Sequence, residues 1–273
     1  MTKGFIVHAN GNNYVEQAYL LALSLKNCNT VPISIITNDV LTNKQKTVFD
    51  QIIKIPWTNE EVDRFDTANR WKIYHASPYE KTIVLDSDIL ILQNLDTLWK
   101  FLDNYQLYFP TNVYTYRGNK VTSNYYRKAF VANNLPNIYS TLYYFCKGEY
   151  AHEFFKWVEL ISNNWELFYG QFCTEYYPKV PSMDITHAIA SKILDIDTEI
   201  TNNKTMFPNI VHMKTHCQDW KRPTESWQLK VGCYLDEQKY LKIGNYIQNC
   251  IFHYTEDDFI KDSFFEIFER TEL

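Results

Sequence analysis

Two aspartates separated by one serine interrupt an apolar, β-branched stretch, KTIVLDSDILILQ, at residues 81–93. Side chains alternate in direction along a strand, so Asp86 and Asp88 would point to one face and Ser87 to the other. Neighbouring carboxylates repel one another, and burying them beside apolar residues costs free energy unless a cation lies between them. We therefore predict a divalent metal on this pair: Mg²⁺, or Mn²⁺ if an imidazole joins the two carboxylates.

Two alternatives remain open for the same residues. The pair could form an ordinary solvated turn, because Asp and Ser favour turns at strand ends. It could also belong to a phosphatase of the haloacid-dehalogenase type, which needs a covalent aspartyl nucleophile. In those enzymes the aspartate pair normally follows the first strand, whereas the first apolar run here, GFIVHAN, contains no acid. We rank the phosphatase below the metal site.

The elements around the pair alternate between strand and helix patterns. Strand patterns cover residues 5–9, 31–37, 52–55 and 82–92, and helical patterns cover residues 12–26, 42–49, 69–76 and 95–104. This alternation predicts an α/β fold with a mostly parallel sheet flanked by helices. Ligands of such sheets bind beyond the carboxyl ends of the strands. Asp86 and Asp88 follow the apolar run 82–85, so we expect them at that edge.

The second half of the chain has a looser pattern. It contains a strand pattern at 138–146, helical patterns at 150–161 and 185–194, and several short strand patterns between 227 and 254. We expect this half to close a pocket over the first half.

Composition excludes several function classes. The net charge is −5 without a long basic run, which argues against a nucleic-acid backbone binder. No stretch approaches the ~18 apolar residues of a membrane span. The seven glycines are too scattered for a dinucleotide or P-loop fingerprint. The six cysteines contain no CxxC pair, so we expect reduced thiols in a cytoplasmic protein.

Four stretches together resemble one enzyme family. PYEKTIVLDSDILIL resembles the Asp-x-Asp strand of GT-A glycosyltransferases, particularly the glycogenin-like and bacterial lipopolysaccharide galactosyltransferase group (family eight). VHANGNNYVEQAYLLALSLK is similar to their opening strand and helix, and NRWKIYHASPYEK to the segment before the Asp-x-Asp strand. SMDITHAIASKI is similar to the acidic segment of their sugar pocket. The resemblance covers about two-thirds of the chain.

This resemblance implies a Rossmann-like GT-A fold in one domain, residues 1–273. Residues 1–108 would form the nucleotide-binding half, and residues 109–273 the acceptor and sugar-pocket half, with a C-terminal β-rich extension and a final helix. The implied enzyme transfers a sugar from a nucleotide-sugar, UDP-linked in this group, with retention at the anomeric carbon. It would use Mn²⁺ or Mg²⁺ and an unknown glycan, lipid or protein acceptor.

The resemblance also implies roles for single residues. Asp86 and Asp88 would hold the metal, Asp184 would line the sugar pocket as one catalytic candidate, and Lys214 is the other. The resemblance implies that Tyr14 stacks on the base and that Arg70 is the basic residue that reaches the nucleotide-sugar, with Lys72 as the second choice for that role. The other residues implied to contact the nucleotide-sugar are Ala9, Asn10, Asp86 and Ser87.

A histidine completes the metal site in this group, in a pattern like HxxGxxKPW. His212 matches the outer spacing to Trp220, but the Gly, Lys and Pro of the pattern are replaced here. His253 ends an apolar strand pattern just before a final helix, so we favour His253 and keep His212 as the alternative. Lys214 would replace the missing lysine at the diphosphate. The degraded pattern also leaves open a non-catalytic carbohydrate- or partner-binding module on the same scaffold.

Overall fold

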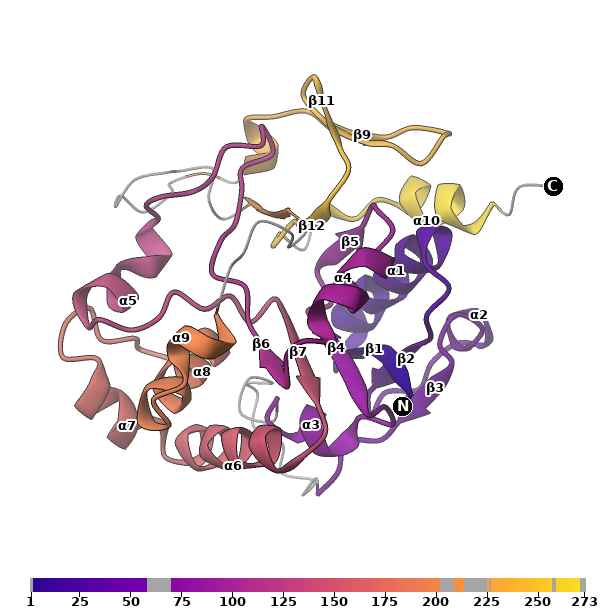
Figure 1. The fold of residues 1–273 in the computed structure, drawn as a ribbon. Helices are drawn as coiled ribbons and strands as arrows, with labels where there is room; N and C mark the ends of the chain where they lie inside the picture. The colour runs from indigo at the N-terminus through magenta and orange to yellow at the C-terminus, as the bar shows by residue number, and fades with distance from the viewer. Residues whose placement is uncertain are drawn as a thin grey trace.

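The computed structural model describes residues 2–57, 70–201, 209–213, 225, 227–256 and 259–270. Its centre is a six-stranded sheet in the order β3-β2-β1-β4-β7-β6 (Figure 1). The strands are β1 (Lys3–His8), β2 (Ile33–Ile36), β3 (Gln51–Ile53), β4 (Lys81–Leu85), β6 (Leu107–Tyr108) and β7 (Leu142–Cys146). β1 to β4 are mutually parallel, and β7 is antiparallel to both neighbours. The predicted mixed, mostly parallel sheet is therefore confirmed.

Helices cover both faces of this sheet because its strands are apolar on both sides. Phe5 and Val7 of β1 pack into one core with α1 (Asn12–Cys28) and α4 (Asp96–Leu102). Ile6 points the other way, into a core with α3 (Lys72–Ala76), α6 (Glu149–Asn163) and α8 (Met183–Ile193). The further helices of the described chain are α2 (Asn43–Lys46), η2 (Tyr125–Arg127), α5 (Lys128–Ala132), α7 (Trp165–Phe172), α9 (Asp197–Ile200) and η4 (Trp227–Leu229).

The apolar run around the two aspartates is not one strand, which corrects the prediction for residues 82–92. β4 ends at Leu85, residues 86–88 connect the strands with a turn at Ser87 and Asp88, and β5 (Ile89–Ile91) continues in a different sheet. The alternation argument for the two carboxylates is therefore wrong, because it assumed a continuous strand. Their expected place at the carboxyl end of β4 is confirmed.

Two smaller sheets consist mostly of short strands from the C-terminal region, where a β-rich extension was predicted. β5 pairs with β12 (Ile251–His253), which also pairs with β8 (Ile210–His212). The third sheet consists of β9 (Cys233–Leu235), β10 (Leu241–Ile243) and β11 (Tyr246–Gln248). The final helix, α10 (Asp262–Glu269), packs on α1, and the two lie side by side in Figure 1.

The predicted strand at residues 138–146 begins only at Leu142. The backbone N–H of Ser140 donates to the side chain of Asp184, at 2.7 Å, instead of joining a strand ladder. Residues 138–141 therefore form a loop, and one of its backbone N–H groups binds the side chain of Asp184. Among the helices that the structure describes, none has the length and apolar character that a membrane crossing requires.

Candidate active site

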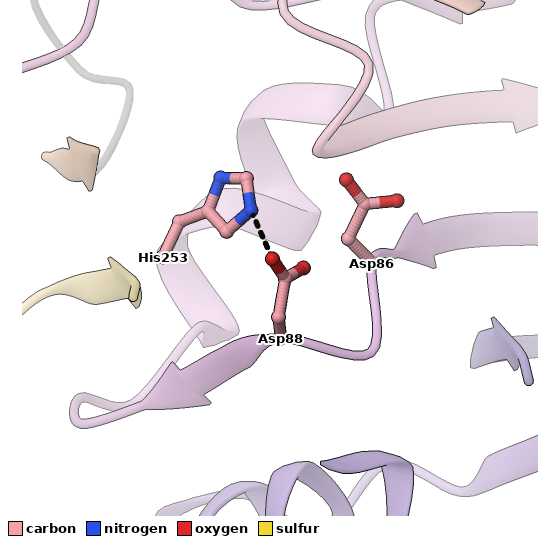
Figure 2. Close-up of side chains that lie close together, drawn as sticks. All are labelled: Asp86, Asp88 and His253. Atoms are coloured by element: carbon pink, nitrogen blue, oxygen red, sulfur yellow. Dashed lines mark hydrogen bonds and ion pairs between the residues drawn. The ribbon is translucent and has the colours of Figure 1, made fainter. Parts of the chain in front are cut away.

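Asp86, Asp88 and His253 converge at the carboxyl edge of the central sheet. Asp86 directly follows β4, Asp88 directly precedes β5, and His253 ends β12, whose register places it opposite Ile89. One ligand atom from each residue lies within 4.8 Å of the other two. Figure 2 shows the His253 ring reaching from its strand toward the turn that carries both carboxylates. Strand pairing thus joins residues that are 165 positions apart in the chain.

Thr141 connects the members of this group. Its hydroxyl donates to Asp86 Oδ2 at 3.3 Å and lies 2.8 Å from His253 Nδ1. The ring tautomer decides which of the two, the Thr141 oxygen or Nδ1, donates in this contact. The other ring nitrogen, Nε2, then faces Asp88 Oδ2 at 2.9 Å.

These residues fit a divalent metal. Two carboxylates and one imidazole nitrogen are a typical donor set for Mn²⁺, and Mg²⁺ prefers the carboxylates. A metal-binding histidine usually donates its second ring N–H to a fixed acceptor, which Thr141 supplies here. The ligand side chains are mostly buried, with 24% of Asp88 and 6% of His253 exposed. Asp86, 17% exposed, forms an ion pair with Arg70, so a cation already compensates one carboxylate.

Thr141→Val is expected to weaken Mn²⁺ binding about 10–100-fold, because it removes both hydrogen bonds while keeping the side-chain volume. Isothermal titration with Mn²⁺ measures the effect without any turnover. Thr141→Ser keeps the hydroxyl and should bind like the wild type. Equal affinity of the valine and serine variants would show that this hydroxyl does not position the ligands.

His212 lies beside the group but is not one of its three members. β8 and β12 run parallel with His212 opposite His253, and the two rings stack with centroids 4.5 Å apart and planes 18° apart. His212 also contacts the ring of Tyr139 edge-on, at 5.7 Å. The geometry therefore favours His253 as the third ligand, with His212 supporting its ring.

Asp184 lies in the first turn of α8 and is held by two donors. The N–H of Ser140 donates to Oδ1 at 2.7 Å, and the guanidinium of Arg127 contacts Oδ2 at 2.8 Å. Burial alone would raise the pKa of Asp184, but Arg127 and the Ser140 N–H outweigh it and hold the pKa below its ordinary value. Asp184 is therefore a fixed anionic hydrogen-bond acceptor and a weak base.

Arg127 is a site residue that the sequence did not reveal. It is 7% exposed, its Nη1 donates to the carbonyl of Ile138 at 2.9 Å, and its guanidinium lies 3.6 Å from the ring centroid of Tyr139. The segment around it, NYYRKAF, carries no motif. Only the fold brings it to Asp184, so no local sequence signal could have identified it.

Tyr139, Ser140 and Thr141 link the two parts of the site. Thr141 contacts the metal-ligand group, Ser140 contacts Asp184, and Tyr139 packs between Arg127 and His212. The placement of the carboxylate pair relative to Asp184 is thus set by three consecutive residues of one loop.

One cavity of about 450 Å³ adjoins both parts of the site. Asp86, Arg70 and His253 line it on one side, and Arg127 and Asp184 line it on the other. Both halves of the chain therefore contribute to its wall, and its size suits a small-molecule substrate.

Four other residues nominated from the sequence do not line this cavity. Tyr14, on the first turn of α1, is 48% exposed, and Asn10 Oδ1 accepts from the backbone N–H of Asn38 at 3.0 Å. Ala9 is buried, and the Ser87 hydroxyl donates to Gln17 at 2.9 Å.

Two lysines nominated from the sequence, Lys72 and Lys214, are not placed at this cavity by the described structure. Lys72 donates to the carbonyl of Trp57 at 3.3 Å and lines a separate cavity. Lys214 lies outside the described residues.

The sequence matches no protein-family model and no curated protein. Among solved structures, the glycosyltransferase GlyE of Streptococcus pneumoniae TIGR4 matches 71% of this chain with 16% identity and a TM-score of 0.43; the match spans only 43% of the GlyE chain. The galactosyltransferase LgtC, solved with donor and acceptor sugar analogs, matches 68% of this chain and 70% of its own, with 14% identity and a TM-score of 0.47. Mouse xyloside xylosyltransferase 1 matches 70% of this chain and 82% of its own, with 9% identity and a TM-score of 0.48. Because these TM-scores lie below 0.5, we argue the function from the geometry of the site.

Proposed function

We propose that the chain is a metal-dependent glycosyltransferase that transfers a sugar from a nucleotide-sugar, UDP-linked, to a glycan, lipid or protein acceptor with retention at the anomeric carbon. The observation that supports this proposal is the group of Asp86, Asp88 and His253 beside a cavity of about 450 Å³. Arg70 and Asp184 also line this cavity. The five described cysteines are free thiols, which accords with a cytoplasmic enzyme.

Asp86, Asp88 and His253 would hold Mn²⁺ or Mg²⁺, which supplies Lewis-acid stabilisation of a diphosphate leaving group. Arg70 already lies against Asp86, so its guanidinium is placed to bind phosphate oxygens with charge-assisted hydrogen bonds. Tyr14 would stack on the base, and Lys214 would bind the diphosphate.

Asp184 would accept hydrogen bonds from sugar hydroxyls at a fixed position. In the transfer, the bond between the anomeric carbon and the diphosphate oxygen breaks, and the electron pair leaves with the diphosphate. A bond to the acceptor oxygen forms as that hydroxyl transfers its proton to the departing diphosphate oxygen, which carries the electron pair of the broken bond. Arg127 holds the pKa of Asp184 below its ordinary value, so we assign Asp184 a binding role and no proton transfer. We also assign Asp86, which is paired with Arg70, a binding role.

Thermal unfolding with UDP and Mn²⁺ tests the proposal. UDP together with Mn²⁺ should raise the melting temperature, and EDTA should remove the increase. A screen of UDP- and GDP-sugars should then find one donor that is hydrolysed slowly in Mn²⁺ and not in EDTA.

Other outcomes of the same screen favour other functions. Hydrolysis of a chromogenic phosphate ester without an acceptor would favour the phosphatase. Sugar binding without hydrolysis of any donor would favour a non-catalytic module, and absence of UDP stabilisation would contradict the proposal.

His253→Ala is expected to weaken Mn²⁺ binding by at least about tenfold more than His212→Ala, because only His253 belongs to the ligand group. His212→Ala removes a stacked neighbour and should change the affinity less. Electron paramagnetic resonance of free Mn²⁺ measures both. The reverse order of affinities would identify His212 as the ligand.

A further inference from the structure

A second cavity, of about 460 Å³, lies beside the contact between α3 and α6. Its lining residues are Trp57, Trp71, Lys72, His75, Glu159 and Asn163. None of them lines the cavity at Asp86 and Asp184. The combination of two tryptophans with an acid, an amide and an imidazole is what a selective binding site needs.

The two tryptophans form a prearranged platform. Their rings stack with centroids 5.8 Å apart and planes 14° apart. Trp71 is 8% exposed, whereas Trp57 is 64% exposed, so Trp57 has one face on Trp71 and most of its remaining surface open. The ring of His75 packs edge-on against both tryptophans, at 5.2 Å and 5.8 Å.

The backbone of Trp57 is held in an unfavourable conformation. Its φ is 54°, in the left-handed region that bulky residues rarely adopt. The ammonium of Lys72, a residue only 9% exposed, donates to the carbonyl of Trp57 at 3.3 Å and helps to hold this conformation. Backbone strain of this kind persists only where the surrounding structure holds it in place.

Polar groups border the platform. Glu159 and Asn163 lie four positions apart on α6, and therefore on the same helix face. The carboxylate of Glu159 partly offsets the effect of burial on the pKa of Lys72 and on that of His75. The Nε2 atom of His75 is buried and lacks a hydrogen-bond partner among the residues that the structure describes. Burial lowers the pKa of His75, so its ring stays neutral and can donate or accept a hydrogen bond.

We propose that this cavity binds a sugar ring of a neutral carbohydrate. The apolar C–H face of the ring would lie on Trp57, and its hydroxyls would bond to Glu159 and Asn163. A cationic ligand fits less well, because the ammonium of Lys72 already lies 5.7 Å from the centroid of the Trp71 ring. The inference goes beyond the transferase site and is independent of it, since the platform would bind a saccharide whether or not the chain transfers one.

Saturation-transfer NMR on the full chain tests the site. The probes are neutral oligosaccharides ending in glucose, galactose, N-acetylglucosamine or xylose, at millimolar concentration. We expect one of them to bind, and Trp57→Ala to weaken its binding about tenfold or more. Trp57→Phe should retain part of the affinity. Tyr240→Ala, at a residue that is 54% exposed and lines neither cavity, is the matched control and should bind like the wild type.

Three results would overturn the proposal: no probe binds the wild type, Trp57→Ala binds as well as the wild type, or tetramethylammonium binds this cavity in preference to every sugar. The melting-temperature increase with UDP and Mn²⁺, measured on the same variants, keeps the two proposals separate. Trp57→Ala should retain that increase. If UDP and Mn²⁺ raise the melting temperature of neither the wild type nor any variant, the transferase proposal is contradicted. The sugar-binding measurements on Trp57→Ala would still stand.

Discussion

Asp88→Asn is expected to abolish the Mn²⁺-dependent stabilisation by UDP and to lower sugar transfer about 10³-fold. The substitution keeps the size of the side chain and removes one of the two negative charges that would hold the cation. Asparagine can still form a hydrogen bond with His253, so the local contact at 2.9 Å need not be lost. The effect should therefore appear in metal and nucleotide binding, and the melting temperature without ligand should change little.

Asp96→Asn is the matched control for this experiment. Asp96 is an exposed aspartate in the first turn of α4, and it lies outside the group of potential ligands. This variant should keep the full UDP effect and full transfer. If Asp88→Asn also keeps both, the carboxylate pair does not bind the metal on which the proposed reaction depends.

Arg127→Met is expected to lower the free energy of unfolding by about 3 kcal/mol, the lower end of the range for breaking a buried ion pair, because 28% of the Asp184 side chain is exposed. Methionine preserves much of the packing against Tyr139 and Phe130 but leaves the carboxylate of Asp184 without its counter-ion. Urea denaturation measures the change. The free energy of unfolding of Arg127→Lys should lie between those of the wild type and Arg127→Met, since lysine keeps the charge but lacks the planar guanidinium.

The difference between wild type and Arg127→Met should depend on pH. The pKa of Asp184 is lowered in the folded wild type, so its contribution to stability is present above the unfolded-state pKa of about 4 and is lost as the pH falls through the folded-state pKa. The variant lacks the interaction with Arg127. The stability gap should therefore be full at neutral pH and narrow as the pH falls below about 4. A gap that does not vary with pH would assign the loss to packing.

The sequence predicts the parts of the fold that depend on local patterns. Apolar runs with helical segments between them predicted the parallel strands, and the end of the run at Leu85 placed Asp86 and Asp88 at the correct edge of the sheet. The short strands and the final helix of the C-terminal region were likewise visible in the sequence.

The features that the sequence did not predict depend on tertiary contacts. The break between β4 and β5 is invisible because both flanks are apolar, and only their pairing with different sheets separates them. The proximity of His253 to the two carboxylates follows from the pairing of β5 with β12, a contact between segments distant in the chain. Arg127 and Thr141 carry no motif and act through partners that only the folded chain brings near.

The turn at residues 86–88 joins a strand of the central sheet to a strand of the sheet formed by β5, β12 and β8, and His253 belongs to the latter. An ion held by all three side chains would add a cross-link between these two sheets, which are otherwise connected by packing, by the 86–88 segment and by the hydrogen bond between Thr141 and His253. Release of the ion and separation of the sheets would then be one cooperative event, so chelation should lower the unfolding temperature of the whole molecule.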